Sequence, residues 1–246
     1  ELLGALPALA GRAPEVVGEM DASSLSWTIW AMAVLRGACR SESRRALPAL
    51  LRRLPALAGS LAVEELADVA WALGVLGEEV RSHLSQQALK TIQVRASQVV
   101  QGAALEDLAR ICWGLSHFSG PGSVDARLMK AIAAVVVERA PGAGPAVVGE
   151  ELAQLVCAFA RLQLRHGGMM RAVAARATED VEALDTGGLL MLRWAYSELY
   201  AEDETRKAEG FLGRLAAELE RRGAEERAVS EASLPPPPPR QPRSLA

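Results

Sequence analysis

The residues that most often carry out chemistry in proteins are few and scattered in this chain of 246 residues. Its histidines, His83, His117 and His166, lie far apart. None has a second histidine or a carboxylate three or four residues further on, the spacing that places two metal ligands on one helix face. The sequence contains no Gly-x-Ser-x-Gly motif, and no serine, histidine and aspartate recur at a fixed spacing. We therefore predict no metal site, no cofactor and no enzymatic activity.

The three cysteines, Cys39, Cys112 and Cys157, form no Cys-x-x-Cys motif and no even set for disulfide pairing, which favours a reducing compartment. Cys112 and Cys157 fall inside a repeated apolar pattern, so we interpret them as small core residues. The glycine-rich stretch 141–151 has no strand before it and no Gly-Lys-Ser/Thr after it, so it predicts an inter-helix loop instead of a phosphate-binding loop.

One short phrase recurs five times along the chain, and it defines the elements that must position any functional side chain. The copies align on a central large residue, and the spacings between these anchors are 41, 42, 44 and 37 residues. Leucine stands five residues before every anchor, and a small residue follows each anchor directly. The anchors are Trp30, Trp71, Trp113, Cys157 and Trp194.

Within each copy the apolar residues at positions −5, −2, +2 and +5 lie on one stripe of period near 3.6, which predicts an amphipathic helix. Acidic pairs precede three copies, where the helix dipole favours negative charge. A second amphipathic segment follows each copy, and these segments are 44–59, 83–100, 124–140, 167–184 and 204–223.

Each unit therefore reads as helix, turn, helix, and it can bury its apolar face only against its neighbours. We predict an all-α protein, an α-solenoid of about five such units of roughly 40 residues over residues 1–223. Residues 1–12 read as the second helix of an earlier unit. Residues 224–246, which include five consecutive prolines, predict a disordered proline-rich tail. Either a bare tail or a docking segment for an SH3- or WW-type module fits this composition.

The charge balance excludes a strongly basic protein, because 27 Lys and Arg stand against 30 Asp and Glu, a net charge of −3. Nearly all the positive charge is arginine, which suits bidentate phosphate contacts but also follows from GC-rich codons. No run of 18 uncharged apolar residues is present, so we predict no membrane-spanning segment.

Two columns of the repeat vary from copy to copy. Positions −3 and +4 lie seven residues apart on one helix face, with the small residue at +1 between them. They form either a row of specificity positions, one set per repeat, or solvent-facing positions under no packing constraint, and spacing alone leaves both open. Position −3 holds Trp27, Asp68, Arg110, Gln154 and Met191, and position +4 holds Val34, Val75, His117, Arg161 and Glu198.

The phrases "LADVAWALGVLG" (66–77) and "LARICWGLSHFS" (108–119) resemble the octotricopeptide-type repeat, which also marks FAST-kinase-domain and RAP-domain proteins and RNA-editing substrate-binding complex-like proteins of protists. The resemblance implies binding of single-stranded RNA in mitochondria or plastids, in support of transcript processing, stability, editing or translation. Carried onto this chain, the RNA-facing residues would be Trp27, Asp68, Arg110, His117, Gln154, Arg161 and Arg193.

Two departures from the family's pattern matter. The asparagine usual after Leu-Ala is replaced by Asp68, Arg110 or Gln154, and no RAP or nuclease-like module follows the repeats. We therefore expect a non-catalytic RNA-binding protein. The alternative is a protein–protein interaction scaffold, with partners held in the groove of the solenoid or on the proline-rich tail, because solenoid grooves serve both purposes and a negative chain is disfavoured next to a polyanion.

Overall fold

The computed structural model describes residues 11–36, 40–77, 86–118, 122–199 and 202–223. The described part of the chain is helical and contains no β-strand, so the predicted all-α class is confirmed. The predicted tail, 224–246, and most of the segment 1–12 lie outside these residues.

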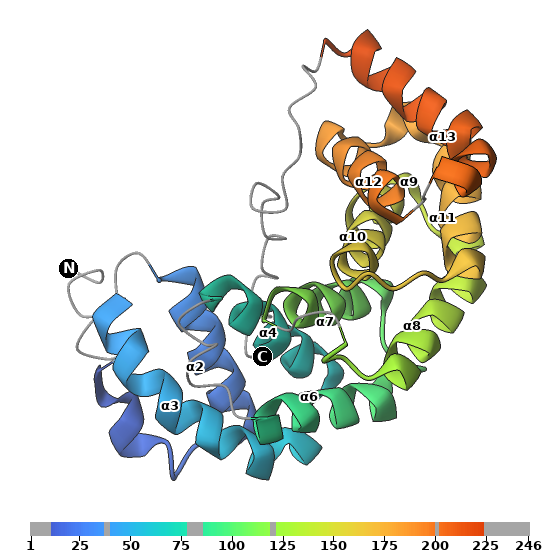
Figure 1. Ribbon diagram of the computed structural model, residues 1–246. Helices are drawn as coiled ribbons and strands as arrows, with labels where there is room; N and C mark the ends of the chain where they lie inside the picture. Colours follow the sequence, from blue (N-terminus) through green and yellow to red (C-terminus); the bar gives the residue numbers. More distant parts are fainter. Residues whose placement is uncertain (1–10, 37–39, 78–85, 119–121, 200–201, 224–246) are drawn as a thin grey trace.

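The helices form two layers along an arc (Figure 1). The five recurring phrases form five helices that we call the inner layer. These helices pack on one another in chain order. They are α2 (Ala22–Val34), α4 (Val63–Leu76), α7 (Leu105–Phe118), α10 (Ala153–Arg161) and α12 (Thr186–Leu199). The second segments give the outer layer, which also packs in chain order. They are α3 (Arg40–Leu57), α6 (Gln86–Val99), α8 (Ala126–Arg139), α11 (Gly167–Glu179) and α13 (Glu202–Arg221).

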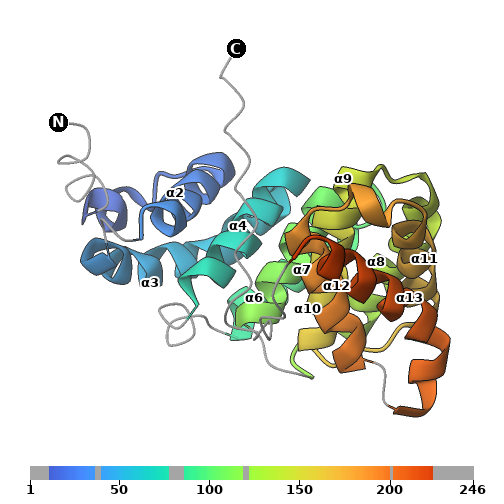
Figure 2. The same ribbon diagram turned by 90° about the horizontal axis from the view of Figure 1, so that it is seen from above.

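The view from above shows the same alternation of inner and outer helices along the chain (Figure 2). Each predicted helix pair is therefore present, with its ends shifted by a few residues. The largest shift is in the fourth pair, where the inner helix starts early, as α9 (Pro145–Val147), and passes through a π-helical turn (Val148–Leu152) before α10. Residues 145–151 are helical, so the prediction of an inter-helix loop over 141–151 is wrong for this part. Glu150 and Glu151 lie in the π-helical turn, whereas the acidic pairs of the second and third copies lie in the first turn of α4 and α7.

The recurring leucines and the residues at position +2 form the core between the layers, as their spacing predicts. Every leucine at position −5 is at most 1% exposed, and every side chain at +2 is at most 4% exposed. They are Leu25, Leu66, Leu108, Leu152 and Leu189, with Met32, Leu73, Leu115, Phe159 and Tyr196. The phrase therefore recurs because each copy supplies the same apolar stripe to one continuous core.

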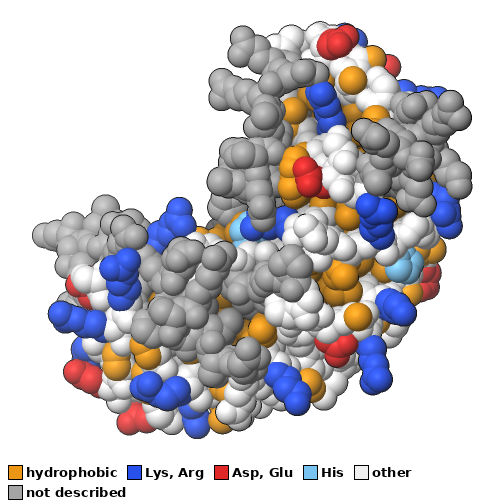
Figure 3. All heavy atoms as spheres, viewed as in Figure 1, with side chains coloured by type: hydrophobic (Ala, Val, Ile, Leu, Met, Phe, Trp, Pro, Cys, Tyr) orange, Lys and Arg blue, Asp and Glu red, His pale blue; other side chains and the backbone are white. Residues whose placement is uncertain are grey.

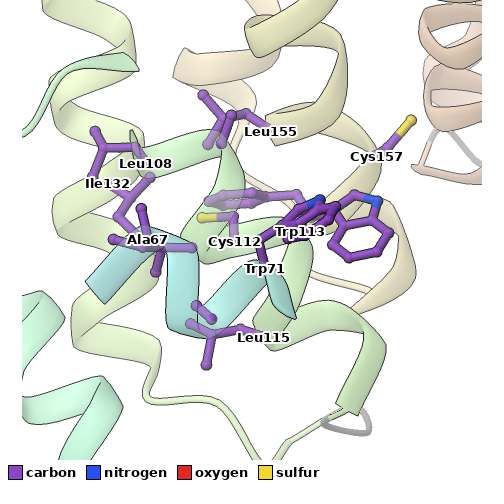
Figure 4. Close-up of a cluster of buried hydrophobic side chains, with 14 of the residues drawn as sticks. Ala67, Trp71, Leu108, Cys112, Trp113, Leu115, Ile132, Leu155 and Cys157 are labelled. Atoms are coloured by element: carbon purple, nitrogen blue, oxygen red, sulfur yellow. The ribbon is translucent and has the colours of Figure 1, made fainter. Parts of the chain in front are cut away.

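Small residues let the inner helices approach closely. A Cβ atom on Gly114 of α7 would lie 2.0 Å from the carbonyl oxygen of Ala70 in α4, and one on Gly74 would lie 2.6 Å from the Trp113 ring. The Trp71 and Trp113 rings stack across this contact, with centroids 6.4 Å apart (Figure 4). A similarly close approach occurs between the fourth and fifth copies, where a Cβ on Gly188 of α12 would lie 2.3 Å from the carbonyl oxygen of Gly149.

Candidate functional site

Arg110, one of the candidates for an RNA contact, is buried between the inner helices α4 and α7. Its side chain is 3% exposed, it forms an ion pair with Asp68 of α4, and its Nη2 lies 3.0 Å from Asp107 Oδ1. The guanidinium group of Arg110 is therefore already paired with two carboxylates of the protein itself. The expectation that position −3 presents Arg110 and Asp68 to a ligand is wrong in this respect, because the two residues pair with each other across neighbouring copies.

The remaining candidates are spread over the inner layer. Gln154 is only 6% exposed, so it is also withdrawn from the surface. His117 is half-buried against Trp113, with ring centroids 3.7 Å apart, and Arg161 and Arg193 are half-buried. The structure therefore brings Asp68 and Arg110 together, and the other candidates lie on α2 (Trp27), α7 (His117), α10 (Gln154 and Arg161) and α12 (Arg193).

Trp27 belongs to a different kind of surface. It is 42% exposed, and Val34, seven residues further along the same helix, is 44% exposed. Helix α2 contains no charged residue. This face of α2 is apolar, which suits contact with protein better than contact with phosphate.

The two described cysteines are core residues, as predicted. Burial raises the pKa of the Cys112 and Cys157 thiols, so neither is a thiolate near neutral pH. The Cys157 thiol lies 3.3 Å from the carbonyl oxygen of Met191 on the next inner helix. Among the described residues, no three His, Cys, Asp or Glu side chains gather where they could hold a metal ion. No helix described in the structure is both long and apolar enough to cross a membrane.

A column of arginines in the outer layer was missed by the sequence analysis. Each lies near the end of an outer helix and donates to backbone carbonyls just before the inner helix of the same pair. Arg95 donates to Leu61 O, Arg139 to Ala103 O and Gln101 O, Arg176 to Ala143 O, and Arg222 to Leu184 O and Glu182 O. We call these four residues the clamp arginines, because each links the end of an outer helix to the backbone that precedes the inner helix of the same pair.

For three of the clamp arginines, Arg95, Arg139 and Arg176, a signal is present in the sequence. An arginine stands 18 residues before every anchor of the repeat, at positions 12, 53, 95, 139 and 176. The apolar columns do not reveal it, because the arginine belongs to the second helix, outside the recurring phrase. The high arginine content of the chain therefore has a structural cause in part, because the guanidinium groups of the clamp arginines donate to backbone carbonyls of the protein itself.

Replacing Arg139 with methionine should lower the free energy of unfolding by about 1.5–3 kcal/mol, the range for hydrogen bonds from a charged donor. The substitution leaves the carbonyl oxygens of Ala103 and Gln101 without their guanidinium donor. Arg127 of the same helix is exposed and gives the matched control, since Arg127→Met should change stability by no more than about 0.5 kcal/mol. Urea unfolding followed by circular dichroism measures both, and equal effects would contradict the clamp role.

The two layers carry opposite charge. The inner helices, with the π-helical turn before α10, contain eight Asp or Glu against three Arg, a net charge of −5. The first four outer helices, α3, α6, α8 and α11, contain twelve Arg or Lys against three Glu, a net charge of +9. The last outer helix, α13, has six acidic and four basic residues. A net charge of −3 for the whole chain thus hides a basic outer layer.

The basic side chains of the outer layer are largely at the surface. Figure 3 shows Lys and Arg side chains along the outer margin of the arc over α3, α6 and α8, with fewer Asp and Glu side chains between them. Among the exposed ones are Arg45, Arg52, Lys90, Arg127, Lys130 and Arg171. No protein-family model matches the chain, and no curated protein matches it.

Proposed function

We propose that this chain is a non-catalytic protein that binds single-stranded RNA, and that its helical pairs form an α-solenoid. A role in organellar RNA processing, stability, editing or translation, in a mitochondrion or plastid, belongs to the proposal and depends on the octotricopeptide-type resemblance alone. Stacked helix pairs with a continuous core provide a long surface of the kind that extended ligands need.

The charge of the outer layer is the observation that supports RNA. Four neighbouring helices with a net charge of +9 attract a polyanion, even though the chain as a whole is slightly negative. Only three Glu lie in these helices, so the carboxylates do not neutralise the layer. Charge gathered on one side of a protein is the usual electrostatic footprint of a nucleic-acid binder.

A protein–protein scaffold is the second candidate, and the inner layer favours it. Trp27 and Val34 give α2 an exposed apolar face, and the buried pairing of Arg110 removes one of the three inner-layer cations from any phosphate contact. The two functions do not exclude each other, because they use opposite sides of the helix pairs.

Titration of fluorescent single-stranded RNA with the purified chain at several salt concentrations tests the proposal. Six phosphate contacts predict a slope of log K against log salt of about −4, at roughly −0.7 per contact, and therefore a loss of two to three orders of magnitude in affinity between about 50 and 200 mM salt. Fluorescence anisotropy gives both quantities. Affinity that is weaker than millimolar at the lowest salt, or that does not change with salt, would reject RNA binding and leave the scaffold.

A further inference from the structure

We infer that the RNA backbone crosses the outer layer on a strip of exposed cations and does not lie on the inner layer. This inference depends on the proposed RNA binding. It departs from the expectation that variable positions of the inner helices read the RNA. We call the six side chains the basic strip, and they are Arg45 and Arg52 of α3, Lys90 of α6, Arg127 and Lys130 of α8, and Arg171 of α11.

The basic strip lies on one face of the outer helices. Counted back from the arginine that stands 18 residues before each anchor (Arg53, Arg95, Arg139 and Arg176), the six residues stand 1, 5, 8, 9 or 12 positions earlier. At about 100° per residue, these positions fall within a sector of roughly 100°. Arg95, Arg139 and Arg176 lie outside this sector and donate to the backbone of their own helix pair. The outer layer therefore separates the arginines that hold the fold from the cations that face solvent.

The basic strip extends over four helices that pack in chain order. Helix α3 packs on α6, α6 on α8, and α8 on α11, so each helix contributes one or two cations to the same side of the outer layer. Helix axes in contact lie about 8–10 Å apart, so the four helices span roughly 24–30 Å across the strip. A flexible single strand can follow the outer side of the arc in Figure 1, whereas a straight duplex would touch it over a shorter length.

The outer helices also indicate how the RNA is read. Helices α3, α6, α8 and α11 contain no Phe, Trp or Tyr, so they offer no ring on which a base can stack. Arginine and lysine contacts to phosphate carry no sequence information. The basic strip should therefore bind oligouridine and oligoadenosine with affinities within about threefold of each other, unlike a reader of one base per repeat.

A membrane of anionic lipid is the competing polyanionic surface. Interfacial protein segments bury large apolar side chains such as Trp, Phe and Leu beside their cations. The outer layer exposes only two large hydrophobic residues among those described, Val94 and Val137. Single-stranded RNA is therefore the favoured ligand, and vesicle binding is an outcome that the experiment has to exclude.

The test uses three variants of the full chain. The first replaces Lys90, Lys130 and Arg171 with glutamine, and the second replaces the inner-layer Arg161 and Arg193 with glutamine. The third is Lys90→Arg with Lys130→Arg, which keeps the charge. Thermal unfolding by circular dichroism shows whether each variant is folded. Anisotropy is measured with labelled oligouridine and oligoadenosine, and sedimentation is measured with phosphatidylserine-containing vesicles.

We expect the triple glutamine variant to lose at least about tenfold in RNA affinity and to lower the salt slope by about 2, at roughly 0.7 per lost contact. The inner-layer variant and the charge-retaining variant should bind as the parent chain does. RNA binding that is lost in the inner-layer variant and kept in the triple variant would overturn this inference and leave the proposed function intact. Tighter binding to vesicles than to RNA would overturn it as well. A parent chain that binds neither oligonucleotide would reject the proposed function itself.

Discussion

Replacing Gly114 with alanine is expected to destabilise the protein by at least about 3 kcal/mol, at or above the upper end of the range for overpacking. The added Cβ would lie 2.0 Å from the carbonyl oxygen of Ala70 and 2.4 Å from its carbonyl carbon. Both atoms belong to the backbone of α4, so no side-chain rotation relieves the clash. Either α4 and α7 move apart and expose the Trp71–Trp113 stack, or the pair does not form.

Gly213→Ala is the matched control for Gly114→Ala. Gly213 also lies inside a helix, α13, but nothing stands within 4 Å of the Cβ that alanine would add. Alanine is favoured over glycine in an exposed helix interior by about 0.5–1 kcal/mol, so this variant should be slightly more stable than the parent chain. Urea unfolding of the three proteins measures the difference. A Gly114→Ala protein as stable as the parent would show that α4 and α7 do not pack this closely.

Replacing Arg110 with leucine is expected to cost about 3–5 kcal/mol, the range found when one partner of a buried ion pair is removed. The substitution leaves two carboxylates, those of Asp68 and Asp107, without the guanidinium between them. Asp107 is almost fully buried and Asp68 largely so, so water does not replace the lost contacts well. Urea unfolding of Arg110→Leu measures the loss.

A double-mutant cycle separates the ion pair from the other effects of the substitution. Asp68→Asn together with Arg110→Leu should be less destabilising than the sum of the single variants, with a coupling of about 1–3 kcal/mol. Additive effects would show that the two side chains do not interact. The consequence for binding experiments is direct: loss of RNA binding in an Arg110 variant reports on folding and cannot serve as evidence for a contact with RNA.

The core and the helix pairs were predictable from the sequence, because burial imposes the same apolar residues at the same positions in each copy. The columns at −5 and +2 illustrate this, since their residues are nearly inaccessible in every copy. At Arg110 and Gln154 the variable column at −3 is buried, so these two positions do not face solvent. A position can vary from copy to copy because it is matched to a neighbouring helix, as Asp68 is to Arg110, and not only because it faces solvent or a ligand.

The candidate site could not be located from the sequence alone, since its position depends on which helices lie side by side. The basic residues of the outer helices can be seen in the sequence. Acidic inner helices separate them, however, and offset their positive charge in the net charge of the chain. Only the packing of α3, α6, α8 and α11 into one layer brings the cations of distant segments together. Arg95, Arg139 and Arg176 show the same point, because the 18-residue offset can be interpreted only once their carbonyl acceptors are known.

Lysine acetylation followed by mass spectrometry, with and without saturating oligouridine, tests most directly whether RNA lies on the basic strip. The chain has only three lysines, and two of them, Lys90 and Lys130, are exposed members of the strip on neighbouring helices. Bound RNA is predicted to slow acetylation of both severalfold, and added salt that releases the RNA should restore the rate. Unchanged acetylation of Lys90 and Lys130 under conditions where anisotropy shows the RNA to be bound would contradict an outer-layer path for the RNA.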